Sequence, residues 1–535
     1  MNETEFNLID EPWIRVMDSS CRVSEVSLKE ALLRAHEYKA LSGELPTQDI
    51  AVMRLLLAVL HTVYSRVDEN GAPAPLDDEE EDDAIDRWKA LWDKGRFSEK
   101  AVSEYLDKWH ERFWLFHPER PFGQVAGLSV GTDYDAPKLN GEISESSNKT
   151  RFFSMYSGDS KAFLTYPQAA RWLLYLNAFD DNSSHPGTGA GWLGKLGLTY
   201  LVGKNLFETI VLNLVMINND IVQSEQKPIW EKETVSSKKK NQIPGSNNLA
   251  ELYTLQSRRI ILNRKDGRVV SFKLLGGDFF EKENAFFEPM TVWNKPKKDN
   301  DPYTPRRHDH SKQMWREFAV LFDEKANRNA GVINWFRSYL KPLLPRAYLM
   351  RTAITAVEYG DKDFFVQNVF SDSLTMHADL LTDLGADWRD KIEKEISRCE
   401  ELAKAAAALA RGLYVASGGS NSDKDKHYMS IPADVKSQIY YRLDIPFREW
   451  LRSIDPECAD EKLKYAGQLE WQQKARNIAS SYAEELSSQL SEIAFAGHKV
   501  KVKDQSGKTE RTVLYSAPRA MNKFYADLNR IYQKE

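Results

Sequence analysis

Two histidines flank an aspartate in the segment PRRHDHSK, at His308, Asp309 and His310. On a strand, imidazole and carboxylate groups at this spacing can bind a divalent metal ion, which would support a hydrolase or nuclease. The segment is polar and basic, however, and the chain has no H-E-x-x-H motif. A solvated loop is therefore the favoured interpretation, and a metal-dependent hydrolase or nuclease centred on His308 and His310 is kept as the alternative.

A cluster of glycines in SHPGTGAGWLGKLG, residues 184–197, is the second candidate for chemistry. Glycine permits positive φ and close approach of the backbone, so such a cluster can present main-chain N–H groups to a phosphate or to a base edge. The P-loop signature G-K-[ST] is absent from it, and no strand precedes its G-x-G-x-G run, as a dinucleotide site would require. Spacing alone therefore predicts a flexible turn.

The other reactive side chains form no catalytic motif. Cys21, Cys399 and Cys458 are far apart and include no C-x-x-C pair, which argues against a disulfide framework and a four-thiolate zinc site. No G-x-S-x-G elbow occurs, and only ten histidines are spread over the chain. We therefore expect no enzyme, no metal and no cofactor, although two distant carboxylates would leave no motif.

The elements that position these residues belong to a large globular chain. Its 535 residues predict two or three domains, and 42% hydrophobic residues can form a sizeable core. No apolar run reaches the ~18–20 residues that cross a bilayer, and the N-terminus is acidic where a secretory signal would be basic. We expect a soluble cytoplasmic protein without a membrane partner.

Hydrophobic periodicity divides the chain into two regions. Residues 1–375 mix predicted strands and helices, and residues 376–535 show repeated spacings of three and four that predict a four-helix bundle. The fold class is therefore α+β, with a large N-terminal mixed α/β domain. The predicted elements are helices at 51–65 and 167–179, a strand and helix within 198–219, strands at 259–263 and 269–275, a hairpin at 354–370, and helices at 390–414, 431–454, 463–493 and 514–531.

Charge is segregated along the chain. The formal net charge is −6, but Lys227–Lys312 holds 18 Lys or Arg against 11 Asp or Glu, a net +7. The remaining residues carry −13. The middle segment can therefore form a local basic face on a protein that is acidic overall.

A polar stretch at Tyr134–Ser160 predicts a long loop with one apolar island, at Phe152, Phe153, Met155 and Tyr156. These aromatic residues either anchor the loop to the core or contact a ligand that orders it.

Several separated stretches together resemble the CasA family, the large subunit of the type I-E CRISPR Cascade surveillance complex. They occur in the family's order and are LIDEPWIRV (8–16), HPERPFGQV (117–125), HPGTGAGW (185–192), LVGKNLFETIVLNLV (201–215), GDFFEKENAFFEPM (277–290), VEYGDKD (357–363) and SDSL (371–374). The resemblance implies a non-enzymatic protein that joins other Cascade subunits and crRNA. It also implies recognition of the protospacer-adjacent motif (PAM) in double-stranded DNA through the minor groove, help in opening the duplex, and recruitment of a helicase-nuclease.

The same resemblance implies roles for individual residues. The glycine loop falls on Gly187, Gly189, Ala190 and Gly191, and the lysine finger falls on Lys282, which is otherwise a surface lysine between two glutamates. The wedge that opens the first base pair falls on YGDKD, where the family commonly has glutamine in place of Asp363. An aspartate is repelled by phosphates, so either Lys362 substitutes for it or the wedge works differently.

A loop near the crRNA and the PAM corresponds to Phe152, Phe153 and Ser154. The zinc knuckle of some family members has no counterpart, because no cysteine lies between Cys21 and Cys399. A purely structural assembly subunit is a further alternative to the DNA-recognition role.

Overall fold

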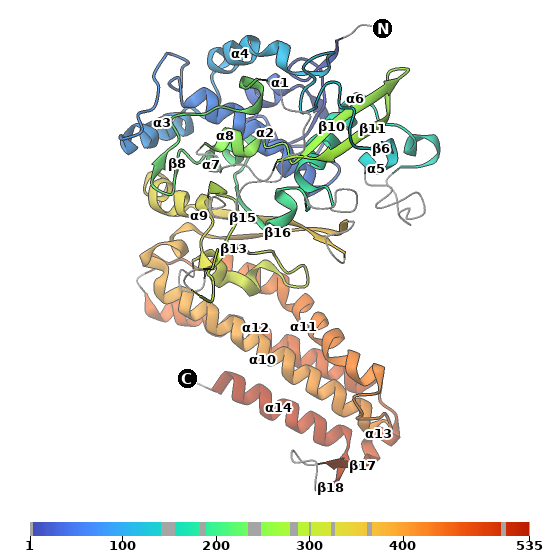
Figure 1. Ribbon diagram of the computed structural model, residues 1–535. Helices are drawn as coiled ribbons and strands as arrows, with labels where there is room; N and C mark the ends of the chain where they lie inside the picture. The colour runs from blue at the N-terminus through green and yellow to red at the C-terminus, as the bar shows by residue number, and fades with distance from the viewer. Residues whose placement is uncertain are drawn as a thin grey trace. The chain divides into compact units, whose positions relative to one another are not determined.

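The computed structural model describes residues 4–140, 156–181, 189–233, 248–278, 287–298, 301–322, 327–360, 366–458, 460–503 and 510–533. The chain divides into two compact units (Figure 1). Unit 1 contains Met1–Lys312, Val320–Pro345 and Met350–Ser373. Unit 2 contains Leu374–Glu535 together with two short earlier segments, Gln313–Ala319 and Arg346–Leu349.

The N-terminal half of unit 1 alternates short strands with helices. Its strands are β1 (Glu5–Asn7), β2 (Ile14–Asp18), β3 (Val23–Val26), β4 (Tyr38–Leu41), β5 (Trp114–Phe116) and β6 (Thr132–Asp135). Its helices are α1 (Leu28–Leu33), α2 (Pro46–Tyr64), α3 (Glu81–Lys94), α4 (Glu99–Lys108), α5 (Ala136–Leu139) and α6 (Tyr166–Phe179). The long loop predicted from Tyr134 is therefore wrong at its start, where β6 ends and α5 follows.

The strands that follow are two to twelve residues long, and the last two of them extend into segments of unit 2. They are β7 (Leu198–Val202), β8 (Ile217–Asn218), β9 (Ile221–Val222), β10 (Arg258–Lys265), β11 (Arg268–Gly276), β12 (Trp293–Asn294), β13 (Thr304–Pro305), β14 (Asn327–Arg328), β15 (Leu349–Tyr359) and β16 (Val366–His377). The helices between them are α7 (Leu206–Leu212), α8 (Leu249–Tyr253) and α9 (Gly331–Trp335).

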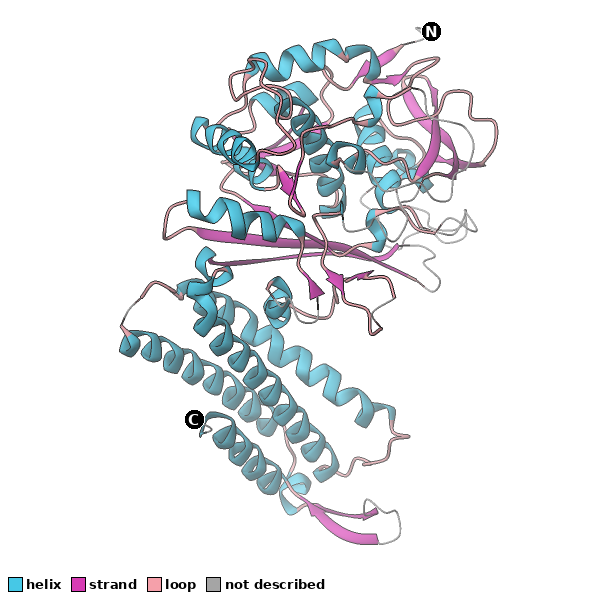
Figure 2. Cartoon of the chain, turned by 60° about the vertical axis from the view of Figure 1, so that its left-hand side comes forward, coloured by secondary structure: helices cyan, strands magenta, loops and turns pink. Residues whose placement is uncertain are grey.

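Two three-stranded sheets carry the loops of interest. One has the order β10-β11-β6 and the other β16-β15-β7, and the long strands of the second are prominent in Figure 2. The β10–β11 hairpin turns at Asp266 and Gly267, which both have positive φ, as a two-residue hairpin turn requires. At the other end of that hairpin Arg258 pairs with Gly276. The predicted strands at 259–263 and 269–275 are confirmed.

Helices α2 and α6 form the centre of the unit 1 core. Helix α2 starts at Pro46 and is buried on all sides, as expected of a helix that is apolar all round. Helix α6 begins with a reciprocal capping box between Thr165 and Gln168. Its last residue, Phe179, is buried, so α6 ends inside the unit at the start of the glycine-rich segment. Both predicted helices are confirmed.

Unit 2 is built on four long helices that run side by side, with α10 in contact with the other three (Figure 1). They are α10 (Ala386–Ala416), α11 (Lys426–Ser453), α12 (Glu461–Ser488) and α14 (Ala517–Gln533). Together with the mixed structure of unit 1 they confirm the predicted α+β class. Within the described ranges, no helix combines the length and the apolar character needed to cross a membrane.

The predicted ends of the last two helices were wrong. A short helix, α13 (Glu492–Ala496), and a hairpin of β17 (His498–Lys503) and β18 (Glu510–Tyr515) separate α12 from α14. The sequence HKVKVK alternates with a period of two, which is a strand pattern. Gly497, at φ +89°, makes the break that precedes β17.

Candidate functional site

The glycine-rich segment that follows α6 is held in place by close backbone contacts. Gly191 donates its N–H to the carbonyl oxygen of Asp180 over 2.8 Å, and a Cβ on Gly191 would lie 2.5 Å from the carbonyl oxygen of Ala178. Ala190 is completely buried. Ala190 and Gly191 therefore form the buried part of the loop. Only glycine fits at position 191 without movement of the backbone.

Gly189 is the part of the described loop with exposed surface. It has φ +75°, which favours glycine, and a Cβ there would lie 2.7 Å from Nζ of Lys195. The lysine therefore packs over the loop and adds a positive charge to it. Sequence analysis missed Lys195, although it lies in the same GWLGKLG stretch. Gly187 lies outside the described residues.

A buried arginine on β10 fixes the base of this loop. Arg258 is fully buried and donates from Nε to Oδ2 of Asp180 over 2.5 Å. Its Nη2 donates to the carbonyl oxygens of Asp181 (2.9 Å) and Gly189 (3.0 Å), and its Nη1 donates to that of Ser257 (2.9 Å). The planar guanidinium thus ties the end of α6 to the glycine loop and to β10.

A second cation balances the two aspartates. Nζ of Lys138, on α5, lies 3.0 Å from Oδ2 of Asp181 and 4.0 Å from Oδ1 of Asp180. Burial alone would lower the pKa of Lys138, but the charges of Asp180 and Asp181 outweigh it and leave that pKa above its ordinary value. Lys138 therefore stays charged, and the cluster is a compensated buried network.

The β15–β16 hairpin reaches the same place through Tyr359, the last residue of β15. Its buried hydroxyl donates to the carbonyl oxygen of Phe179 over 2.7 Å, and a side chain at Gly194 would collide with it. Burial raises the pKa of Tyr359 well above its ordinary value, so the hydroxyl keeps its proton and remains a donor. Lys362 and Asp363, at the tip of this hairpin, lie outside the described residues.

Lys282 belongs to the segment 279–286, and residues that flank this segment on both sides hydrogen-bond to residues beside the glycine loop. At its start, Gly277 donates its N–H to the carbonyl oxygen of Ser257 over 2.8 Å. At its end, Glu288 accepts two hydrogen bonds from buried Arg54, of 2.8 and 2.9 Å, and one from the indole N–H of Trp192 over 3.1 Å. Lys282 itself lies outside the described residues, as do Phe152, Phe153 and Ser154.

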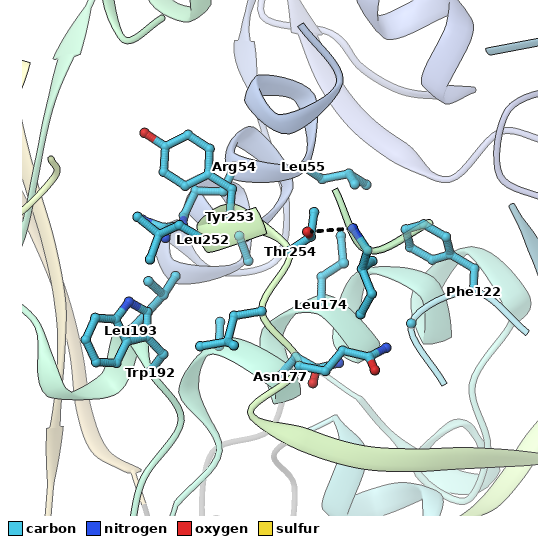
Figure 3. Close-up of a pocket in the computed structure, with 16 residues that line it drawn as sticks. Arg54, Leu55, Phe122, Leu174, Asn177, Trp192, Leu193, Leu252, Tyr253 and Thr254 are labelled. Atoms are coloured by element: carbon cyan, nitrogen blue, oxygen red, sulfur yellow. Dashed lines mark hydrogen bonds between the residues drawn. The ribbon is translucent and has the colours of Figure 1, made fainter. Parts of the chain in front are cut away.

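Trp192 lines a small pocket of about 60 Å³ (Figure 3). Trp192 and Phe122 line opposite sides of it, and Arg54 stacks on the ring of Tyr253 with 4.4 Å between guanidinium carbon and ring centroid. The cavity has room for a few water molecules and none for a nucleotide.

The histidine cluster does not assemble into a metal site. The ring Nε2 of His308 donates to the carbonyl oxygen of Leu198 over 3.1 Å, whereas Nδ1 of His310 lies 3.2 Å from a carboxylate oxygen of Glu358. Across the parts of the chain that are described, no group of three or more His, Cys, Asp or Glu side chains is placed to hold a metal ion. The structure thus gives the hydrolase alternative no support, and His308 contributes to packing against β7.

The comparisons with known proteins agree on one family. The model of the CRISPR-associated protein Cse1 family matches residues 7–529. CasA/Cse1 of Thermus thermophilus is 29% identical over 419 residues, which are 76% of this chain and 77% of the relative. The crystal structure of Thermobifida fusca Cse1 superposes with a TM-score of 0.78 at 26% identity, over 99% of this chain and 98% of that chain. Cse1 of Acidimicrobium ferrooxidans has the same fold, with a TM-score of 0.80 at 22% identity, over 100% and 99% of the two chains.

Proposed function

Because this chain belongs to the CRISPR-associated protein Cse1 family, the large subunit of the type I-E Cascade complex, we propose that it reads the PAM of double-stranded DNA through the minor groove. It acts as a non-catalytic subunit in the cytoplasm, together with other Cascade subunits and crRNA. Base pairing with the RNA reads the target, and the protein reads only the short duplex motif.

One observation supports this proposal above the others. The stems of the glycine loop, of the segment 279–286 and of the hairpin tip 361–365 meet around Arg258, Trp192 and Tyr359. These three loops lie more than 70 residues apart in sequence, yet residues that flank the glycine loop are hydrogen-bonded to the stems of both of the other loops, through Tyr359 and through Glu288. A duplex that contacts one loop is therefore within reach of the other two.

Each loop has its own part in the proposal. The minor groove exposes acceptor atoms, purine N3 and pyrimidine O2, which Lys282 can meet with a charged donor. Gly187 and Gly189 bring bare backbone to the base edges, and Ala190 and Gly191 hold that backbone in place. Because the minor-groove pattern is degenerate, we expect a tolerant PAM rather than a single sequence.

The hairpin tip acts next to the groove-reading loops. Separating one base-pair step costs about 1.4 kcal/mol of stacking, which formation of the RNA–DNA heteroduplex then returns. A wedge made by Lys362 and Asp363 therefore needs to open only the first pair beside the PAM. We propose that the large subunit, once bound to an opened target, also recruits the helicase-nuclease that degrades it.

The proposal is tested by Lys282→Ala in the assembled complex. Loss of one charged hydrogen bond costs about 1.5–3 kcal/mol, so affinity for a PAM-bearing duplex should fall about 10- to 100-fold while assembly is unchanged. Lys265→Ala is the matched control, because Lys265 lies at the opposite end of the β10–β11 hairpin from Arg258 and Gly276. Equal target binding by both variants over a range of salt would refute the lysine finger and favour a purely structural subunit.

A further inference from the structure

Unit 2 contains a groove of about 550 Å³ that the proposed function does not use. Helix α10 packs against both α11 and α14, and the groove lies over α10 between these two helices. Residues 513–515 of β18 line it where α14 begins. The lining part of α10, residues 404–412, extends over ~12 Å, about two helical turns. The groove is therefore an elongated slot between two helices.

Small residues form the bottom of this groove. Ala408 is exposed and Gly412, one turn later on α10, is partly exposed. A Cβ on Gly412 would lie 3.1 Å from the Cβ of Ala520, so α10 and α14 are in direct contact there. Pro432 lines the opposite wall, on α11. The bottom is thus apolar and shallow, and the backbone of a second helix can come close to α10.

Positive charge is concentrated around this apolar surface. Asp527 is the one acidic residue among the described residues of the lining, and its carboxylate already lies 3.0 Å from the guanidinium of Arg530. Leu374–Glu535 as a whole is neutral, with 25 basic and 25 acidic residues, so the excess is local. Lys436 and Lys523 have no ion pair within the described part of the chain. Five basic residues line the groove: Lys404, Arg411, Lys436, Arg519 and Lys523.

The side chains of the groove favour an acidic protein segment over a strand of nucleic acid. Sites for single strands add aromatic rings on which successive bases stack. Three rings line this groove, but Phe524 is only 1% exposed, and Tyr428 is covered by the guanidinium of Arg411, 4.5 Å from the ring centroid. That leaves Tyr515 alone for stacking. An amphipathic helix, in contrast, uses both the apolar bottom and the basic walls.

We propose that this groove binds an acidic amphipathic helix of a partner protein. The apolar face of that helix lies on Ala408 and Gly412, between α11 and α14. Its carboxylates pair with Lys436 on one wall and with Lys523 on the other, so complementary charge selects the partner. The site uses residues of unit 2 only, and its test therefore needs no PAM-bearing DNA.

The test measures fluorescence anisotropy of labelled peptides with the full-length protein. The probe is a helical peptide of about 14 residues, four turns, with leucine along one face and glutamate on both flanks. A second peptide has lysine in place of every glutamate. We expect the acidic peptide to bind at least about tenfold more tightly than the basic one, and its affinity to fall as salt is raised.

Variants of the groove locate the binding. Lys436→Gln combined with Lys523→Gln should weaken the acidic peptide about tenfold, because both walls lose a charge. Lys462→Gln is the matched control, since Lys462 is an exposed lysine of α12 that does not line the groove. Ala408→Trp places a large side chain on the bottom of the groove and should prevent binding; Ala408 is exposed, so this change leaves the core of the bundle intact.

Four results would overturn the proposal. The acidic and basic peptides bind equally, or the double lysine variant binds the acidic peptide as tightly as Lys462→Gln does. Ala408→Trp binds that peptide like the wild type. An oligothymidylate displaces the peptide at lower concentration than the unlabelled peptide does, which would identify the groove as a site for single-stranded nucleic acid.

Discussion

Replacement of Arg258 by leucine should loosen the glycine loop more than any other part of unit 1. The change removes the ion pair with Asp180 and the hydrogen bonds that Arg258 donates to the carbonyl oxygens of Asp181 and Gly189, whereas the carbonyl oxygen of Ser257 keeps the N–H of Gly277. Nζ of Lys138, 4.0 Å away, is then the nearest cation to the buried Asp180 carboxylate among the described contacts. Removal of one partner of such a buried pair costs about 3–5 kcal/mol, which is at least a 100-fold change in a local opening equilibrium.

Native-state hydrogen exchange of the full chain is the assay, because it reports opening of individual segments. The amide of Gly191, bonded to Asp180, should exchange at least 100-fold faster, and Asp180→Asn added to the arginine variant should restore part of the loss. Arg34→Leu is the control, since Arg34 is half exposed and its surface ion pairs are worth less than about 1 kcal/mol. Unchanged exchange at Gly191 would refute the assignment of Arg258 as the residue that fixes the loop.

Two further predictions concern packing and pH. Gly191→Ala places a Cβ 2.5 Å from the carbonyl oxygen of Ala178 and should destabilise unit 1 by about 1–3 kcal/mol. Gly467→Ala, on α12 with open space around the new Cβ, should stabilise unit 2 by up to about 1 kcal/mol. Urea unfolding measures both free-energy changes, and changes of the same sign would contradict this prediction. Burial lowers the pKa of His61 to about 3, below its unfolded value of ~6.5. Between these two pH values the unfolded state binds more protons than the folded state, so the free energy of unfolding decreases as the pH is lowered from about 6.5 toward about 3. The loss at pH 5 is about 2 kcal/mol, and His61→Leu should remove it from urea unfolding curves; an unchanged difference between pH 7.5 and pH 5 would exclude His61 as the cause.

Elements with a clear period were predictable from sequence, and contacts between distant residues were not. Spacings of three and four between apolar residues located the four long helices, and the density of apolar residues located α2, because both patterns can be read from the local sequence. The sequence analysis missed the β17–β18 hairpin although its lysine–valine alternation is visible. The residues before and after the hairpin had been assigned to the predicted helices at 463–493 and 514–531.

The same distinction applies to the site. The glycine loop was located by composition, but the residues that hold it come from elsewhere. Arg258 is 78 residues from Asp180, and Tyr359 is 180 residues from Phe179. A buried arginine in a strand has no local signature that separates it from a surface arginine, so only the fold identifies it. The spacing of His308 and His310 suggested a metal site that the structure does not form, because His308 contacts the carbonyl oxygen of Leu198 and His310 contacts Glu358.

The central claim is that the loops supported by Arg258 and Tyr359 read the minor groove. It is tested most directly by a mobility shift of the assembled complex with duplexes whose PAM purines are replaced by 3-deaza or 7-deaza analogues. The first analogue removes the N3 acceptor of the minor groove, and the second removes N7 of the major groove. We predict that 3-deazapurine weakens binding about tenfold or more and that 7-deazapurine leaves it within about twofold. Loss of binding with 7-deazapurine alone would contradict the account.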